Sequence, residues 1–318
     1  MKRANGALVA YIAEELARRP VSAGAHAVTD GLRDLYGEAV RGILFYGSCL
    51  RRSDDEGVLD LYVLVDRYRT TYDSRWLALL NTVLPPNVFY FETRLGDKTI
   101  RAKYAVLSLS DLTRSTSPRT FEPYFWARFA QPCALVYAAD AAVGQEVSEA
   151  LAEAVVTLVE HGTALVPERF STSDLWKTTL RETYRCEVRA ERAVAPVDLY
   201  LASPERYAAV TGLALPAVPY PLGSQTVAGE TQWTVRLPSR RRRIAPWVWR
   251  LRRVHGSTLF VLRLLRNALI FEGGVDYVIW KIERHSGVQV DRSWRHRRFR
   301  LLGLGAELWR LYRRGAIR

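Results

Sequence analysis

The sequence predicts an α/β fold in which a mixed β-sheet occupies about the first 150 residues and mostly helical structure follows. Two short apolar runs, 41–48 and 58–65, have the length and composition of buried strands. Segments with the helical spacing of apolar residues stand on both sides of them, at 7–18, 25–36 and 72–84. This alternation of strands and helices is the basis of the predicted fold class.

The remaining elements follow from the same kind of pattern. Two further strands are expected at 88–93 and 99–109, joined around Gly96-Asp97. Helices are expected at 147–164 and 174–191, the second capped by Ser171 or Ser173. The many prolines of 203–240 favour loops and short strands. Basic amphipathic segments then follow at 257–271, 276–285 and 292–314. We therefore expect three parts, namely an α/β domain over 1–150, a mostly helical domain over 151–290 and a basic amphipathic segment over 291–318.

Composition excludes several classes of protein. With 48% hydrophobic residues the chain is expected to fold, and it has no run of the roughly 18–20 apolar residues that a membrane span needs. The apolar stretch Ala7–Ile12 runs directly into Glu14 and Glu15, which predicts an amphipathic helix and not a signal peptide. Three scattered cysteines give no disulfide or zinc framework, so the cytosol is the expected compartment.

The net charge of +13 is concentrated at the C-terminal end. Residues 236–318 contain 20 Arg and 1 Lys against 5 acidic residues, a net charge of +16, which leaves −3 for residues 1–235. A basic surface of this kind attracts a polyanion, whether nucleic acid, anionic lipid or a polyphosphate.

One constellation carries the chemistry. The first predicted strand ends in Gly47-Ser48, a polar loop follows, and the second strand contains Asp60. A charge within a buried strand is costly unless it is paired or binds a cation. This order is typical of polymerase-β-like nucleotidyltransferases, in which the turn and the Ser48 hydroxyl would hold triphosphate oxygens and Asp60 would hold Mg²⁺. The alternative is a structural carboxylate beside an ordinary hairpin glycine.

The second metal ligand is less obvious. Such enzymes commonly carry a second acid two residues after the first, and here that position is Tyr62. Asp54, Asp66 and Glu92 are candidates, and Asp55 is the residue we expect to complete the site. Each of them could instead be a solvated loop charge.

The same residues resemble the mitochondrial translocator-assembly-and-maintenance proteins, a family of peripheral phosphatidate cytidylyltransferases. The resemblance covers about 30–200 and, loosely, 260–285. It lies in five segments: Phe45-Tyr46-Gly47-Ser48 with Val58-Leu59-Asp60-Leu61, Lys103–Ser108, Tyr124–Pro132, Leu165–Leu175 with Tyr184, Glu187 and Arg189 after it, and, weakly, Phe271–Lys281. The chain departs from the family pattern at Ala105, Ala127 and Gln131. Like this chain, the family lacks a second aspartate two residues after the first. Without an obvious transit peptide, the chain is expected to be a bacterial relative.

The resemblance implies a reaction in which CTP and phosphatidic acid give CDP-diacylglycerol and pyrophosphate with Mg²⁺. Lys103 would be catalytic beside Asp60 and Ser48, and the nucleotide would be bound by Gly47, Ser48, Arg51, Arg128, Tyr184, Glu187 and Arg189. The alternatives are structural pairs, Lys103 with Asp97 or Glu92 and Arg128 with Glu122. Two rival functions remain open: transfer to another acceptor (nucleic acid, protein or small molecule), or a basic binding protein with a decayed site.

An enzyme acting on phosphatidate must reach a bilayer. Wound as a helix, 292–314 would carry Trp294, Phe299 and Trp309 among arginines such as Arg310, the composition of an interfacial helix. We expect a cytoplasmic protein, peripheral on the inner face of the cell membrane, with an anionic membrane surface and no nucleic acid as its partner. The alternatives are a helix packed on the domain, or a nucleic-acid patch.

Overall fold

The computed structural model describes residues 3–187, 195–227 and 230–270. Within these ranges, 3–187 and 195–263 belong to one compact unit and 264–270 to a second. The first unit is an α/β structure with a mixed five-stranded sheet and a helical C-terminal region, which confirms the expected class at that level.

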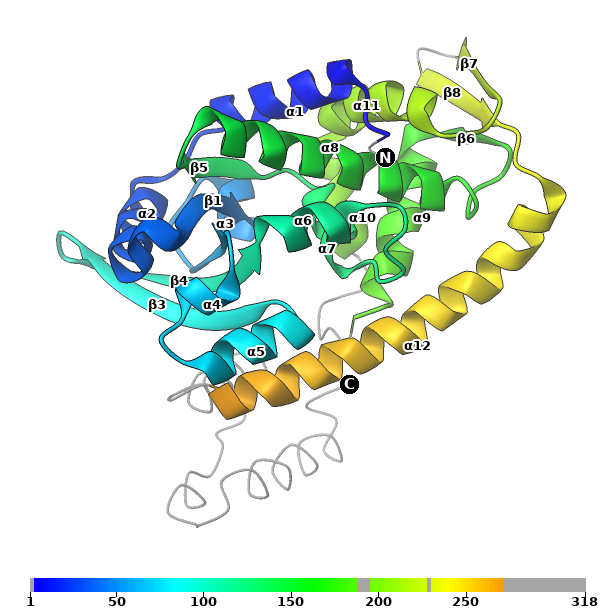
Figure 1. The fold of residues 1–318 in the computed structure, drawn as a ribbon. Helices are drawn as coiled ribbons and strands as arrows, with labels where there is room; N and C mark the ends of the chain where they lie inside the picture. The colour runs from blue at the N-terminus through cyan, green and yellow to red at the C-terminus, as the bar shows by residue number, and fades with distance from the viewer. Residues whose placement is uncertain (1–2, 188–194, 228–229, 271–318) are drawn as a thin grey trace, which may run out of the picture. The chain divides into compact units, whose positions relative to one another are not determined.

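The central sheet has the strand order β3-β4-β2-β1-β5 (Figure 1). β2 and β4 are parallel, whereas β1 is antiparallel to β2 and β5, and β3 is antiparallel to β4. The strands are β1 Val40–Tyr46, β2 Val58–Val65, β3 Asn87–Leu95, β4 Lys98–Ser108 and β5 Ala134–Ala138. β2 has the bounds that its apolar run predicts, and Gly96, with φ of +57°, turns β3 into β4.

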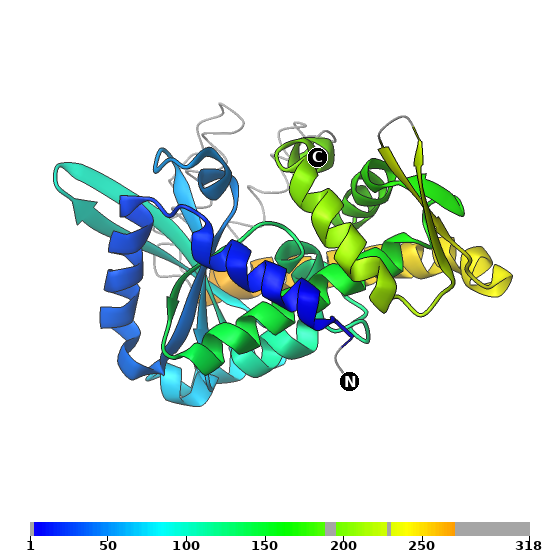
Figure 2. The same ribbon diagram turned by 90° about the horizontal axis from the view of Figure 1, so that it is seen from above.

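Each face of the sheet is covered, so alternate side chains of a strand enter different cores (Figure 2). Phe45 and Leu61 pack with α2, whereas Tyr46 and Tyr62 pack on the side of α1, α7 and α8. The helices of this half are α1 Gly6–Arg18, α2 Ala23–Tyr36, α3 Ser48–Arg52, α4 Tyr68–Thr71, α5 Arg75–Val83, α6 Leu109–Thr116, α7 Tyr124–Phe129 and α8 Ala141–Gly162. A short 3₁₀ helix, Gly37–Ala39, leads into β1.

Local sequence explains where several helices begin. Asn5 and Ser22 cap α1 and α2 through their side chains. The helix expected over 72–84 begins at Arg75 because Ser74 caps it. α8 begins earlier than expected, after the cap Asp140, and it runs through residue 150, where we placed a domain boundary.

A second, smaller sheet follows, with the order β6-β8-β7. Its strands are β6 Arg169–Ser171, β7 Leu222–Val227 and β8 Glu230–Val235. Ser171 also begins α9 (Thr172–Tyr184) through a capping box with Asp174, so the expected cap is correct although β6 was not expected. α10 is Ala195–Leu201, α11 is Pro204–Ala214, and a 3₁₀ helix covers Leu215–Ala217.

Two expectations are wrong in this half. Residues 203–240 contain the helix α11 as well as short strands, because an apolar face that includes Tyr207 and Val210 packs into the main core. The basic helix expected to begin at 257 begins at Ser239 and continues to Ile270 as α12, through Pro246.

Candidate functional site

β1 ends in a turn that requires glycine. Gly47 has φ of +92° and stands between Tyr46, the last residue of β1, and Ser48, the first residue of α3. A Cβ on Gly47 would lie 2.6 Å from Oδ2 of Asp60 and 3.2 Å from its Cβ. The positive φ and the close approach both exclude a side chain here. The backbone of the turn therefore lies directly against Asp60.

Asp60 reaches this position through the pairing of β1 with β2. In their antiparallel register Tyr46 lies opposite Asp60, one residue before the turn. The structure thus brings together the Gly47-Ser48 turn and the strand-borne carboxylate that the sequence placed in one site. Ser48 itself is half-buried at the start of α3.

Lys103 forms an ion pair with Asp60. β2 and β4 run parallel, and their register places Lys103 beside Asp60. Lys103 Nζ lies 2.8 Å from Asp60 Oδ1, and the two side chains keep 34% and 23% of their surface exposed. Solvent therefore reaches the pair, and so could a ligand.

The two oxygens of Asp60 consequently have different surroundings. Oδ1 faces the ammonium group of Lys103, whereas Oδ2 faces the space that a side chain at residue 47 would fill. Mg²⁺ in nucleotide sites is often held by one or two carboxylates together with substrate phosphates and water. Among the described residues no group of three or more His, Cys, Asp or Glu side chains could hold a metal. The geometry fits a single carboxylate that shares its cation with a phosphate ligand.

Asp55, the expected second metal ligand, caps α2 instead. Its carboxylate accepts hydrogen bonds from the Ser22 hydroxyl and, at 3.1 Å, from the N–H of Gly24. A carboxylate at a helix N-terminus stabilises the helix. The other acidic candidates have protein partners too: Asp54 with Arg52 (2.7 Å), Asp66 with Arg41 (3.5 Å) and Glu92 with Arg101 (3.2 Å). Each of the four acids therefore has a partner within the protein.

A second polar cluster surrounds Arg128 of α7. Its Nη1 donates to the hydroxyl of Tyr46 at 3.2 Å, and its guanidinium lies over the rings of Tyr46 and Tyr124, 5.2 and 4.8 Å from their centroids. Its Nη2 lies 3.7 Å from the carboxylate of Glu187. Arg128 and Glu187, expected to act together, are therefore neighbours. Glu122, the alternative partner of Arg128, pairs with Arg263.

Tyr46 links the two clusters. Burial raises the pKa of Tyr46 to about 12, Arg128 opposes that rise, and Asp60 adds to it. A tyrosine with this pKa remains a neutral hydroxyl at physiological pH, able to donate and accept hydrogen bonds. In the sequence Tyr46 stands out only as part of the Phe45-Tyr46-Gly47-Ser48 motif. Its position directly before Gly47 was the signal that it belongs to the site.

Arg51 and Tyr184 both influence the pKa of Tyr207, a residue that no motif in the sequence singled out. Burial raises the pKa of Tyr207 in α11 to about 12, and the charges of Arg206 and Arg51 lower it while Tyr184 raises it. Arg51 is exposed on α3, and Tyr184 ends α9 half-buried. Tyr207 lies in the stretch expected to be loops and short strands, so nothing in the sequence drew attention to it.

Several expected residues lie outside the described part of the chain. These are Arg189, assigned to nucleotide binding, and the membrane residues Trp294, Phe299, Trp309 and Arg310. Among the described residues, no helix is long and apolar enough to cross a bilayer.

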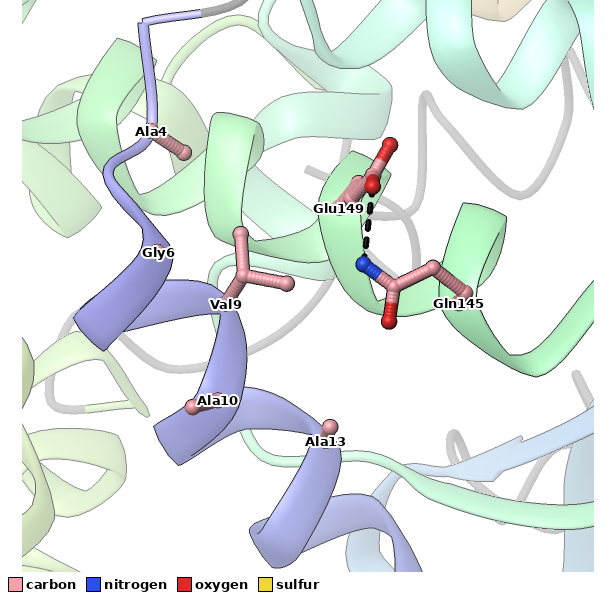
Figure 3. A pocket seen from close by; sticks show the side chains of 7 residues that line it. All are labelled: Ala4, Gly6, Val9, Ala10, Ala13, Gln145 and Glu149. Atoms are coloured by element: carbon pink, nitrogen blue, oxygen red, sulfur yellow. Dashed lines mark hydrogen bonds between the residues drawn. The ribbon is translucent and has the colours of Figure 1, made fainter. Parts of the chain in front are cut away.

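One surface depression in the described part of the chain lies away from the candidate site. It has a volume of about 360 Å³ and is lined by residues at and before α1, with Gln145 and Glu149 of α8, which are joined by a 2.8 Å hydrogen bond (Figure 3). A second, of about 550 Å³, contains Asp66, Arg67 and Glu146. Neither includes Asp60, Lys103 or Arg128, so we do not assign the candidate site to them.

The candidate site is therefore defined by its side chains and by the strand register that brings them together, and not by a surface depression. No protein-family model matches the chain, and comparison with curated proteins gives no match either.

Proposed function

We propose that the chain is a nucleotidyltransferase that moves CMP from CTP to phosphatidic acid and releases pyrophosphate. The convergence of the Gly47 turn, Asp60 and Lys103 on three adjacent strands carries the proposal. It supports a polymerase-β-like domain over about residues 1–150. The choice of CTP and phosphatidic acid comes from the resemblance of the sequence segments described above.

In this reaction an ionised phosphate oxygen of phosphatidic acid attacks the α-phosphorus of CTP. A new P–O bond forms, the bond from the α-phosphorus to the bridging oxygen of the β-phosphate breaks, and pyrophosphate leaves with that electron pair. A phosphomonoester is already ionised at neutral pH, so the protein needs no general base. Its task is positioning and charge neutralisation.

Each residue has a part in that task. Ser48 and the N–H groups of the turn would donate to triphosphate oxygens, and Lys103 would neutralise developing charge. Asp60 would hold Mg²⁺, which supplies further charge stabilisation at the phosphates. Asp55 is left out of the proposed metal site because its carboxylate is engaged at the start of α2.

Arg128 and its neighbours form the second side of the proposed site. Its guanidinium is held by Tyr46 and Glu187, so it is already oriented. An oriented guanidinium binds phosphate oxygens with little loss of side-chain entropy. We propose nucleotide contacts for Arg51, Tyr184 and Glu187 in the same region. A phosphatidate acceptor also implies a cytoplasmic protein that works peripherally at the inner face of the cell membrane.

One observation favours a second candidate function. The ion pair with Lys103 satisfies one oxygen of Asp60 within the protein, as it would in a basic binding protein that no longer catalyses transfer. Such a protein would retain the fold and the charge but would turn over no nucleotide.

An acceptor screen tests the proposal. Purified protein is incubated with Mg²⁺, each labelled NTP in turn, and phosphatidate vesicles, an RNA oligonucleotide or a small alcohol. We expect a labelled lipid with CTP and phosphatidate. Transfer to RNA or alcohol would favour a nucleotidyltransferase with a different acceptor. No transfer with any combination of nucleotide and acceptor would contradict the proposed enzymatic activity.

A further inference from the structure

α12 has a buried face that is fixed to the protein. Ala245, Trp249, Arg252, Gly256 and Arg263 follow one another at helical spacing and are buried. A Cβ on Gly256 would lie 2.7 Å from the carbonyl oxygen of Cys186, so the helix packs closely there. This face leaves the opposite side of α12 directed outward.

Most arginines next to this buried face serve the fold. Arg252 contacts the ring of His161 and donates to the carbonyl of Phe121. Three more form ion pairs: Arg241 with Glu160, Arg253 with Glu182 and Arg263 with Glu122. Arg242 donates to the carbonyl of Val166 at 2.7 Å. Three of these charges are therefore matched by carboxylates, and Arg242 and Arg252 are used in hydrogen bonds within the protein.

The outward face carries a stripe of large apolar side chains, which we call the α12 stripe. It consists of Ile244, Trp247, Leu251, Val254 and Val261, which recur every three, four or seven residues and are 43–69% exposed. Single exposed apolar residues are ordinary, whereas a continuous exposed stripe marks an interaction site.

The charges around the stripe indicate its partner. Residues 239–270 contain nine Arg and no Asp or Glu. Arg240, Arg243 and Arg250 are exposed, and the guanidinium of Arg250 lies 4.8 Å from the centroid of the Trp247 ring. Apolar side chains flanked by arginine, with no acid, match a surface that is apolar inside and anionic outside.

We propose that the α12 stripe docks on an anionic lipid surface, with Leu251 and its neighbours at the acyl boundary and the exposed arginines at lipid phosphates. This inference rests on α12 alone and does not depend on the proposed reaction. It also differs from the anchor expected over 291–318, which lies outside the described residues.

Charge argues against two other occupants, and the apolar character of the exposed face argues against a third. A second copy of α12 would set arginine against arginine, and residues 292–318 bring nine more Arg with one Glu. A nucleic acid would pair with basic side chains, but the exposed face offers more apolar than basic groups. Residues 271–291 contain four acidic and two basic residues, so charge does not argue against them. The experiment below distinguishes them from a lipid surface as the occupant of the α12 stripe.

Vesicle flotation of the full chain tests the proposal with a matched pair of variants. Leu251→Asp places a carboxylate in the stripe, and Leu35→Asp makes the same change on α2, where Leu35 is 56% exposed against 63% for Leu251. We expect the protein to float with vesicles containing phosphatidylglycerol and not with phosphatidylcholine alone. Leu251→Asp should weaken that binding about tenfold, because burial of one such side chain contributes that much. Leu35→Asp should bind as the unaltered chain does, and Leu251→Ala should show a smaller loss.

Several outcomes would contradict docking of the α12 stripe on lipid, and each can be recognised separately. Equal binding by the Leu251→Asp and Leu35→Asp proteins would overturn the proposal. So would binding to an RNA duplex in place of vesicles, or a dimer in sedimentation that Leu251→Asp dissociates. If residues 271–291 cover the stripe, the unaltered chain would not float, and Leu251→Asp would lower the melting temperature far more than Leu35→Asp.

Discussion

The carboxylate of Asp60 lies between a cation and a glycine. Lys103 lies 2.8 Å from one oxygen, and the other faces the backbone of Gly47. The position of each neighbour depends on strand register. The pairing of β4 with β2 places Lys103, and the pairing of β1 with β2 places Gly47. A shift of one residue in either pairing would turn the side chains to opposite faces of the sheet. The site is thus a direct product of the order β4-β2-β1.

Gly47→Ala tests this packing at the residue scale. The new Cβ would meet Asp60 in a backbone conformation that already disfavours a side chain, so the free energy of unfolding should fall by about 2–3 kcal/mol. Gly96→Ala is the control, because Gly96 has φ of +57° and nothing within 4 Å, and it should cost about 1 kcal/mol. Chemical denaturation measures both, and equal losses would show that Asp60 does not crowd residue 47.

His161 provides a pH dependence at the same scale. Nη2 of Arg252, which can only donate, lies 3.1 and 3.2 Å from the two ring nitrogens, so one of these nitrogens must accept and the ring must be neutral. Burial, followed by the charges of Arg252 and Arg241, lowers the pKa of His161 well below its ordinary value.

The unfolded chain therefore binds more protons than the folded one below pH of about 6.5, the ordinary imidazole pKa. The free energy of unfolding should fall as pH drops from that value towards the lower folded pKa. His161→Gln should reduce this fall, while His26→Gln, at an exposed position on α2, should leave it unchanged. Denaturation curves at several pH values measure the effect, and identical slopes for the two variants would contradict it.

At the scale of elements, α12 is held by ion pairs as well as by apolar packing. Arg263 forms two hydrogen bonds with Glu122, and their side chains are only 8% and 11% exposed. Arg263 also donates to the carbonyl of Pro85 at 2.8 Å. The contacts join α12 to segments some 140 and 180 residues earlier in the sequence.

Removing Arg263 alone should therefore be costly. Arg263→Met would leave the Glu122 carboxylate buried beside an apolar side chain and should lower the free energy of unfolding by about 3–5 kcal/mol. The double variant Glu122→Met with Arg263→Met should recover much of that loss, because neither charge is then stranded. Arg250→Met, at an exposed position of the same helix, should change stability by less than about 0.5 kcal/mol. A double variant no more stable than Arg263→Met would argue against a buried pair.

Elements that pack through apolar residues were predictable, and elements that depend on distant partners were not. β2 follows from the run Val58–Val65, and α9 from its cap at Ser171. The first half of α12 was missed because Pro246 and consecutive arginines are typical of a linker. In the folded chain Glu160 and Glu182 pair with Arg241 and Arg253 of this helix. α11 was missed because its buried face also contains Arg206 and Thr211, which find their partners Glu15 and Trp176 only in the folded chain.

The candidate site divides in the same way. Gly47, Ser48 and Asp60 could be predicted because a turn and a carboxylate on neighbouring strands have a local signature. The role of Asp55 could not, since its partner Gly24 lies 31 residues away on α2. Tyr207 is buried against Trp176 and Tyr200 only through tertiary packing, which no short motif encodes.

For the whole molecule, charge is partitioned between the two proposed activities. Residues 1–235, with a net charge of −3, carry the Asp60 site, and residues 236–318, with +16, carry α12 and its exposed arginines. Several of those arginines are used within the fold, so the basicity available to a partner is smaller than composition implies. The two activities can therefore be altered separately, at Asp60 and at Leu251.

The most direct test of the account is the transfer activity of Asp60→Asn. Asn keeps the shape of the side chain but removes the charge that pairs with Lys103 and would hold Mg²⁺. Asp66→Asn, directly after the same strand, is the matched control. With labelled CTP and phosphatidate vesicles, Asp60→Asn should lose at least about a hundredfold in rate while Asp66→Asn keeps the unaltered rate. Equal rates for the two variants would contradict the central claim that Asp60 acts at the reacting phosphates.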